Sequence, residues 1–187
     1  MSPRCKFDHQ FVLQQAMGAF YLQGYYATSM QDIFSATGLK PGSLYSSFGN
    51  KSQLFGLVVN YYAQKGGCNL QRHLDEQADP ERAICALLYE YMSQADEADY
   101  RGCLLFNAQL ELTHHDPELK ALVESHLNKI EAHFQSMLVP KYGELQAKLY
   151  AASLMLQIAG MRTYAYRHPQ PEVLVQVVKQ GLSWLPW

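Results

Sequence analysis

Residues 28–51, TSMQDIFSATGLKPGSLYSSFGNK, contain the helix boundaries that decide the fold. Thr28 and Gln31 have the spacing of a capping box, in which two side chains satisfy the free amide groups at the start of a helix. Gly38 supplies the positive φ that ends this helix, and Pro41 has the fixed φ suited to the first position of another. The stretch therefore predicts two short helices joined by a tight turn.

The second of these helices, residues 41–48, is expected to have two different faces. Leu44 and Phe48 stand four residues apart and should point inward. The outer face has small or polar side chains that would not bar it from a DNA major groove: Lys40, Gly42, Ser43, Ser46 and Ser47.

A third helix is predicted to follow directly. Asn50 and Gln53 have the reciprocal spacing of a cap, and Lys51 lies where a cation can meet a phosphate. Upstream, an amphipathic helix closes at Gly24, so residues 7–62 form a small helical domain with its own apolar centre. The apolar positions of that first helix are Phe11, Val12, Ala16 and Phe20.

This domain closely resembles the DNA-binding domain of TetR-type transcriptional regulators. Glycines, caps and core positions agree in spacing over roughly residues 7–62. The residues that carry the resemblance are Phe20, Gly24, Tyr25, Thr28, Ile33, Gly38, Gly42, Ser43, Leu44, Tyr45, Phe48, Lys51 and Leu54.

The resemblance implies that helix 41–48 is the recognition helix and that Thr28, Tyr45 and Lys51 touch backbone phosphates. The chain departs from the family pattern at Lys40–Pro41 and at Ser46–Ser47, so no base preference is carried over. Lys40 could read a guanine edge or contact a phosphate, and Arg4 and Lys6 could form a DNA-binding arm or a frayed terminus. The expected DNA-binding set is Thr28, Lys40, Gly42, Ser43, Tyr45, Ser46, Ser47 and Lys51.

Charge is unevenly distributed along the 187 residues. The net charge is −2, but residues 1–51 have four basic and two acidic residues, a balance of +2, which leaves −4 for the remainder. This modest positive end predicts weak binding by a monomer and useful affinity from two copies on one double-stranded operator. With no apolar run of membrane-spanning length and no signal peptide, we expect a cytoplasmic protein.

Apolar residues recur at intervals of three and four to the end of the chain, which predicts an all-α fold of about nine helices. We expect a helix-turn-helix DNA-binding domain at 1–66, with the fourth helix acting as a connector to about residue 78, and an effector-binding and dimerisation domain at 67–187. Gly66–Gly67 should weaken the connector. Asp79–Pro80 and Asp116–Pro117 are helix starts, and Pro140 is expected to follow the end of a long helix.

The resemblance also implies a homodimer in which the last two helices, one at about 144–166 and the other containing residues 173–185, pair with their symmetry mates. The two recognition helices would then lie about one DNA turn apart, so the operator should be palindromic. The alternative for the stripe on the last helix is packing within the monomer. That stripe consists of Val173, Leu174, Val177, Val178, Gly181, Leu182 and Leu185.

By the same resemblance, the C-terminal domain encloses a pocket for a small organic effector that relieves repression. The 13 tyrosines favour an aromatic or amphipathic ligand over a compact anion. Any of these residues could instead belong to the core. The expected lining is Tyr89, Tyr91, Cys103, Phe106, Asn107, Leu110, His133, Tyr150, Gln157, Met161 and Tyr164.

The four cysteines lack metal-binding spacing, so neither a disulfide nor a zinc site is expected. Arg101–Leu112, RGCLLFNAQLEL, is similar to a segment in regulators of this family that sense electrophiles and oxidants. Cys103 is expected in the first turn of a helix beside Arg101, where a thiolate is favoured. It could therefore be a redox sensor or an ordinary buried residue.

Other function classes have little support in the sequence. No nucleophile elbow, phosphate-binding glycine loop or paired carboxylates indicate an enzyme, and no cofactor or metal is expected. His114 and His115 are interpreted as helix-end residues, because adjacent side chains on a helix point apart. An architectural DNA-binding protein without an effector remains as the alternative of another class.

Overall fold

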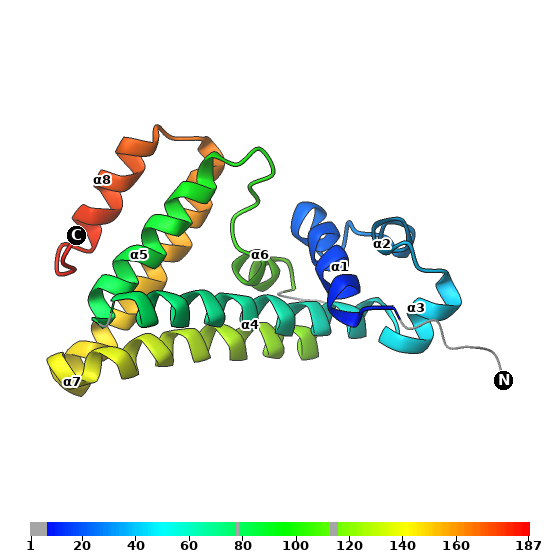
Figure 1. Cartoon of the computed structure of the whole chain (residues 1–187), viewed down its shortest axis with the longest axis horizontal. Helices are drawn as coiled ribbons and strands as arrows, with labels where there is room; N and C mark the ends of the chain where they lie inside the picture. The colour runs from blue at the N-terminus through cyan, green and yellow to red at the C-terminus, as the bar shows by residue number, and fades with distance from the viewer. Residues whose placement is uncertain (1–6, 78, 113–115) are drawn as a thin grey trace.

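The computed structural model describes residues 7–77, 79–112 and 116–187. Within these ranges the chain is helical without strands, which confirms the predicted fold class (Figure 1). No helix in the same ranges is both long and apolar enough to cross a membrane. The α-helices are α1 His9–Gln23, α2 Met30–Thr37, α3 Pro41–Phe48, α4 Lys51–Gln77, α5 Pro80–Ser93, α6 Leu104–Glu111, α7 Pro117–Tyr164 and α8 Pro171–Gly181, with short 3-10 turns η1 Gln94–Asp96 and η2 Ala165–Arg167.

The boundaries of α1, α2 and α3 follow the predicted signals, with one correction. Gly24 and Gly38 end α1 and α2 at φ values of 85° and 67°, and Pro41 begins α3. The capping box of α2, however, is formed by Ser29 and Asp32 instead of Thr28 and Gln31. Asp32 accepts a hydrogen bond from the Ser29 amide at 2.8 Å.

Helix α4 is continuous through Gly66 and Gly67, so the expected weak point is not a break. Figure 1 shows this helix extending from the small helices α1–α3 to the far end of the molecule, beside α5 and α7. Each interior glycine costs a helix about 1 kcal/mol, and packing against two long helices compensates for that cost. The predicted cap is present, because Asn50 Oδ1 accepts from the Gln53 amide at 2.9 Å.

Pro140 does not end the long helix, contrary to expectation. It lies inside α7, and the chain reverses three residues later at Gly143, whose φ of 73° and ψ of 167° are accessible to glycine. Buried Glu81 of α5 holds this corner by accepting hydrogen bonds from Lys141 Nζ, at 2.7 Å, and from the Tyr142 hydroxyl. Gly143 divides α7 into a first arm, residues 117–142, and a second arm, residues 144–164. Counted separately, these arms make nine α-helical segments in the described ranges.

Two apolar cores lie along the molecule. One joins α1–α4 to α6 and the first arm of α7, through residues such as Phe55, Leu105 and Val123. The other joins the end of α4 to α5, the second arm of α7 and α8, through residues such as Leu88 and Leu154. Helix α6 therefore packs with α1–α4, the helices of the predicted DNA-binding domain and its connector, although it follows residue 66 in sequence. The division at that residue stays a prediction.

Candidate DNA interface and effector cavity

Helix α3 presents the outer face that the sequence predicts. Leu44 and Phe48 are buried, and Ser46 Oγ donates to the Ser43 carbonyl oxygen at 3.0 Å. The serine hydroxyls of the outer face and the Lys40 ammonium group are exposed, and a large ligand such as DNA can reach them. The exposed residues are Lys40, Gly42, Ser43, Tyr45, Ser46 and Ser47.

Two of the predicted phosphate contacts are placed differently. Thr28 is fully buried, and its hydroxyl donates to the Gly24 carbonyl oxygen at 2.6 Å, so its side chain is not available to a phosphate. Lys51 Nζ donates to the Tyr26 carbonyl oxygen at 3.2 Å and lies 4.7 Å from the centre of the Tyr25 ring. Burial lowers the pKa of Lys51, but its ammonium group keeps donors for another acceptor.

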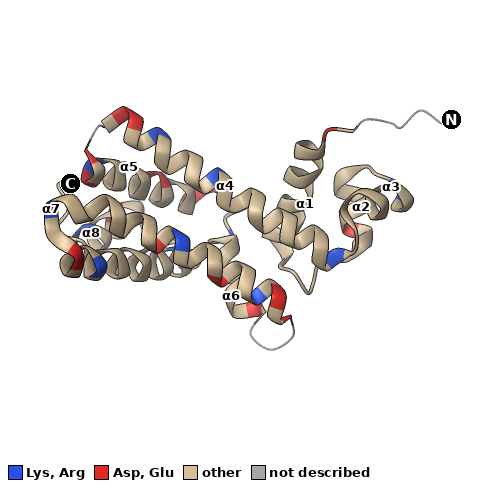
Figure 2. Cartoon of the chain, turned by 90° about the horizontal axis from the view of Figure 1, so that it is seen from below, with Lys and Arg blue, Asp and Glu red and all other residues tan. Residues whose placement is uncertain are grey.

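The DNA-binding end is poor in charge. Helices α1 and α3 contain no Asp, Glu, Lys or Arg, and α2 contains only Asp32, whereas charged residues are spread along α4 and α7 (Figure 2). Arg4 and Lys6 lie outside the described residues. With Lys40 and Lys51 as the described cations at this end, one domain neutralises few phosphates.

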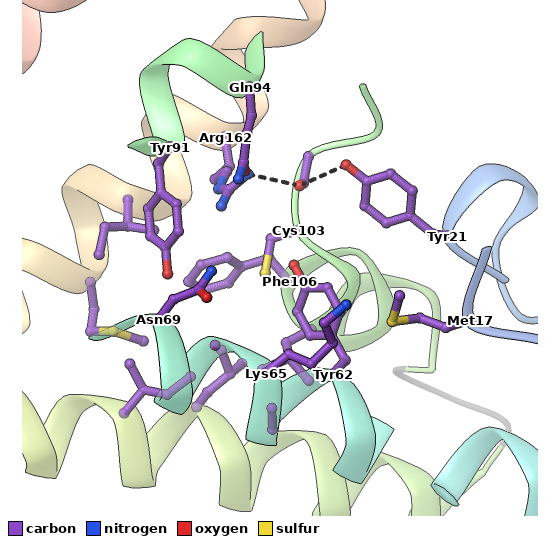
Figure 3. Close-up of a pocket in the computed structure, with 18 of the residues that line it drawn as sticks. Met17, Tyr21, Tyr62, Lys65, Asn69, Tyr91, Gln94, Cys103, Phe106 and Arg162 are labelled. Carbon is purple, nitrogen blue, oxygen red and sulfur yellow. Dashed lines mark hydrogen bonds between the residues drawn. The ribbon is translucent and has the colours of Figure 1, made fainter. Parts of the chain in front are cut away.

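A cavity of about 440 Å³ lies between α1, α4, α5, α6 and both arms of α7. Of the predicted effector residues, Tyr91, Cys103 and Phe106 line it (Figure 3). Helices α1 and α4, which were assigned to the predicted DNA-binding domain and its connector, also line the cavity, and their contribution was not predicted. The other labelled lining residues in Figure 3 are Met17, Tyr21, Tyr62, Lys65, Asn69, Gln94 and Arg162.

The remaining predicted effector residues do not line this cavity. Tyr89, Leu110, His133 and Tyr164 are exposed, and Met161 is buried in the core of α5, α7 and α8. Tyr150 stacks on Trp184 at 4.0 Å, Gln157 lies against Gly181, and Asn107 donates to the Arg101 carbonyl oxygen at 2.6 Å beside a smaller recess. Apolar or aromatic character alone does not specify which face of a helix meets a cavity.

Arg162 is the most unusual residue of the cavity, because it is a cation with an exposed fraction of 6%. Its Nη1 donates to Gln94 Oε1 at 2.9 Å and to the Gly102 carbonyl oxygen at 3.3 Å. Its guanidinium carbon lies 4.0 Å from the centre of the Tyr91 ring. Its Nε is buried without a hydrogen-bond partner among the described residues.

Cys103 is the N-cap of α6 instead of a residue in its first turn. It is half-buried and lines the cavity. The Arg101 guanidinium donates to the Tyr100 carbonyl oxygen at 2.7 Å, and Arg101 lines the neighbouring recess. The cations that share the cavity with Cys103 are therefore Arg162 and Lys65, and not Arg101.

Both ends of α6 contact the DNA-binding helices. At its start, the Gly102 carbonyl oxygen accepts from the Tyr21 hydroxyl of α1 at 3.3 Å, as drawn in Figure 3. At its end, the Glu111 carboxylate accepts from the amides of Tyr25 and Tyr26, at 2.8 and 2.6 Å. The cavity wall and the turn after α1 are thus joined through one short helix.

The other thiols and the histidines of the described ranges do not line this cavity. Cys68 is exposed, and burial raises the pKa of buried Cys85 to about 11. No group of three His, Cys, Asp or Glu residues in the described ranges could hold a metal ion. Cys5, His114 and His115 lie outside those ranges.

Comparison with known proteins places this geometry among DNA-binding regulators. Residues 12–58 match the family model described as bacterial regulatory proteins, tetR family. The chain is 30% identical to the uncharacterized HTH-type transcriptional regulator YezE of Bacillus subtilis, over 76% of this chain and 71% of YezE. It is 30% identical to the HTH-type transcriptional repressor ComR of Escherichia coli, over 54% of this chain and 49% of ComR.

A solved structure supports the same fold over the whole length. The TetR family transcriptional regulator CifR, as a cysteine mutant in complex with a 26-bp double-strand operator DNA, superposes with a TM-score of 0.83. The alignment covers 100% of both chains at 24% identity. The position of α3 at the tip of the molecule is therefore shared with a fold that has been seen on operator DNA.

Proposed function

Because the chain belongs to the TetR family of DNA-binding transcriptional regulators, and is not an enzyme, we propose that it is a repressor released by a small organic effector. It binds a palindromic operator as a homodimer. The observation that carries this proposal is the outer face of α3, where the side chains are exposed and polar while Leu44 and Phe48 anchor the helix from below. Such a helix fits the major groove.

The proposed DNA contacts are those of the outer face and the start of α4. Short hydroxyls discriminate bases weakly, so the position of α3 on the operator depends on Lys40, Tyr45 and Lys51. Thr28 has a supporting role instead, because its buried hydroxyl holds the turn between α1 and α2. The remaining proposed contacts are Gly42, Ser43, Ser46 and Ser47.

The homodimer is proposed to form through the second arm of α7 and through α8. On the second arm of α7, Leu145 and Leu156 are 76% and 75% exposed, and Leu149 is also exposed. On α8, Val173 and Val177 are exposed. The stripe predicted on the last helix is divided. Its members Leu174, Val178, Leu182 and Leu185 pack within the monomer, whereas Val173 and Val177 remain for a second copy.

Helix α6 is proposed to transmit effector binding. A ligand in the cavity contacts residues next to Gly102, whose carbonyl oxygen also binds Tyr21 of α1. The ligand is proposed to favour a position of α6 in which this bond is lost. Helices α1 and α3 then move, and the distance between the two α3 helices of the dimer no longer suits the operator. The coupling is a difference in ligand affinity between the two conformations.

Selection of bound sequences from a random DNA pool with the full chain tests the DNA-binding proposal. We expect enrichment of a two-fold symmetric site with half-sites about one helical turn apart. A Leu44→Ala variant, which removes a buried side chain that anchors α3, is the control. It should retain no specific DNA sequence from the pool. Enrichment of asymmetric sites, or of none, would overturn the proposal of a dimeric operator-binding repressor.

A second mode of release is favoured by one observation, namely that Cys103 lines the cavity. Modification of this thiol by an electrophile or oxidant would place a new group in the same space. Cys103→Ser should then keep operator binding after treatment that releases the wild type, while Cys68→Ser, which changes an exposed thiol, should respond normally. Equal release of both variants would reject Cys103 as the sensor. The cavity itself favours effector control over a purely architectural role.

A further inference from the structure

Arg162 carries a buried positive charge. In the described ranges, ion pairs form between other residues, and none includes Arg162. A guanidinium stays charged at physiological pH. Burying a charge without a partner is unfavourable, so this fold keeps a destabilising group inside its cavity. Such a cost to stability is typical of residues retained for binding.

Nothing else that lines the cavity offsets this charge. Burial raises the pKa of the Tyr62 and Tyr91 phenols, so both remain neutral at pH 7. Glu97 is the carboxylate of the lining, but it is exposed and forms no ion pair with Arg162 within the described residues. Lys65 adds a second cation on the exposed side of the cavity. The lining therefore has an excess of positive charge.

Arg162 is also fixed in orientation. Gln94 and the Gly102 carbonyl oxygen hold Nη1, and the Tyr91 ring lies against the guanidinium plane. Nε is buried and has no hydrogen-bond partner within the described residues, so its N–H is left for an acceptor that the protein itself does not supply. An oriented guanidinium edge matches the two oxygens of a carboxylate.

The rest of the cavity is suited to hydrocarbon. Its volume of about 440 Å³ is in the range of cavities that enclose small organic ligands. The apolar lining is contributed by α6 and by both arms of α7, including Leu105, Phe106, Leu127, Ile130, Phe134 and Met155. A ligand here meets one charged anchor and an apolar wall.

We propose that the effector is an organic acid, whose carboxylate pairs with Arg162 and whose aliphatic or aromatic body fills the apolar part of the cavity. This rests on the proposed function only in treating the cavity as the effector site. A neutral ligand of the same shape would leave Arg162 unpaired and would bind more weakly.

The test compares acids with neutral amides of nearly the same size. 3-Phenylpropionate and 3-phenylpropionamide form one pair, and octanoate and octanamide form the other. Their affinities for the full chain are measured by calorimetry, and their effect on thermal melting is measured in parallel. The variants are Arg162→Gln, which removes the charge, and Arg162→Lys, which keeps it. Arg167→Gln is the matched control, because Arg167 lies over Tyr164 and outside the cavity lining.

We expect at least one acid to bind the wild type about tenfold more tightly than its amide, as for a charge-assisted hydrogen bond. Arg162→Gln should abolish that preference, Arg162→Lys should retain part of it, and Arg167→Gln should leave it unchanged. A folded Arg162→Lys protein keeps the inference testable if Arg162→Gln does not fold.

Two results would overturn the inference: equal binding of acid and amide, including binding of neither, or an acid preference that survives in Arg162→Gln. Operator affinity is then measured in the presence of each acid and each amide, with the operator selected above. This measurement distinguishes the ligand class from the proposed release of the operator. An acid that binds through Arg162 but leaves operator affinity unchanged would reject effector-controlled release and leave the ligand class standing.

Discussion

Tyr21 and Arg162 donate to the same acceptor, since Tyr21 Oη and Arg162 Nη1 each lie 3.3 Å from the Gly102 carbonyl oxygen. Tyr21 belongs to the DNA-binding helices, and Arg162 belongs to the second arm of α7. A carboxylate that draws Arg162 toward itself competes with this carbonyl oxygen. The proposed effector cavity and helix α1 therefore meet at one atom, the Gly102 carbonyl oxygen.

Removing the Tyr21 hydroxyl should weaken this connection. Tyr21→Phe loses the bond to Gly102 and also the bond that the hydroxyl accepts from the Arg101 amide at 3.1 Å. We expect unfolding free energy to fall by about 1 kcal/mol. The change in operator affinity caused by a bound acid should also shrink. Tyr61→Phe, which removes a hydroxyl outside the cavity lining, is the control, and an undiminished ligand effect in Tyr21→Phe would contradict this role.

Glu111 should stabilise the turn that precedes α2. Its carboxylate accepts from two consecutive amides, those of Tyr25 and Tyr26, and hydrogen bonds to a charged acceptor contribute about 1.5–3 kcal/mol each. Glu111→Gln should lower the denaturation midpoint and weaken operator binding together. Glu131→Gln, on the first arm of α7, should change neither. Operator binding that is unchanged in a destabilised Glu111→Gln protein would separate the turn from DNA recognition.

Substitutions of Thr28 and Lys40 should have different effects, the first on stability and the second on the salt dependence of DNA binding. Thr28→Val keeps the shape of a buried side chain but removes its hydrogen bond to Gly24, so stability should fall by about 1 kcal/mol with no change in salt dependence. Lys40→Ala removes an exposed cation and should reduce the slope of log affinity against log salt by about 1. Affinities measured at several salt concentrations distinguish the two. A reduced salt slope in Thr28→Val would restore Thr28 as a phosphate contact.

A charge on the exposed face of α7 should prevent dimerisation. Leu156→Glu changes a side chain that makes little contact within the monomer, so helicity and melting of the monomer should be nearly unchanged. Sedimentation should show loss of the dimer, and operator affinity should fall by more than tenfold because two half-sites are no longer bound together. Leu57→Glu, on an exposed part of α4, is the control. A dimeric Leu156→Glu protein would move the interface elsewhere.

Cys85 should make stability depend on alkaline pH. Burial raises the pKa of its thiol to about 11 from an ordinary value near 9. The native state thus binds the proton more tightly than the unfolded state. The resulting stability is fully present below about pH 9 and is lost as pH rises toward 11. Cys85→Ala should reduce the fall in unfolding free energy across that range by about 1 kcal/mol or more, and identical pH profiles would contradict this.

Local signals predicted the helix boundaries well because they act within a few residues. Gly24, Gly38 and Pro41 each determine the backbone where they stand, and they do so in the structure. Ser29 replaced Thr28 as a cap because either residue satisfies the sequence pattern, and the burial of Thr28 depends on the packing of α1. Glycines in α4 were outweighed by packing against α5 and α7, which a single segment does not reveal.

The cavity was only partly predictable because its walls come from five helices whose rotation is set by tertiary contacts. Tyr91, Cys103 and Phe106 were identified from their residue types. Met17 and Tyr21 were missed because they lie in the domain that was assigned to DNA binding. Arg162 was missed because an arginine on an amphipathic helix ordinarily faces water. Its isolation as a buried cation is visible only once Gln94, Tyr91 and Gly102 surround it.

The unbroken α4 also has a mechanical consequence. At 1.5 Å per residue, its 27 residues form a rod of about 40 Å, and Lys65 at the cavity lies about 21 Å along this rod from Lys51, which follows the end of α3. A tilt of about 5° about the cavity moves the Lys51 end by about 2 Å, which is more than half of the 3.4 Å rise between base pairs. Two such rods in a dimer change the separation of the recognition helices by up to twice that amount. In the proposed dimer, a tilt of α4 by about 5° at the cavity would therefore be enough to put the two recognition helices out of step with the operator.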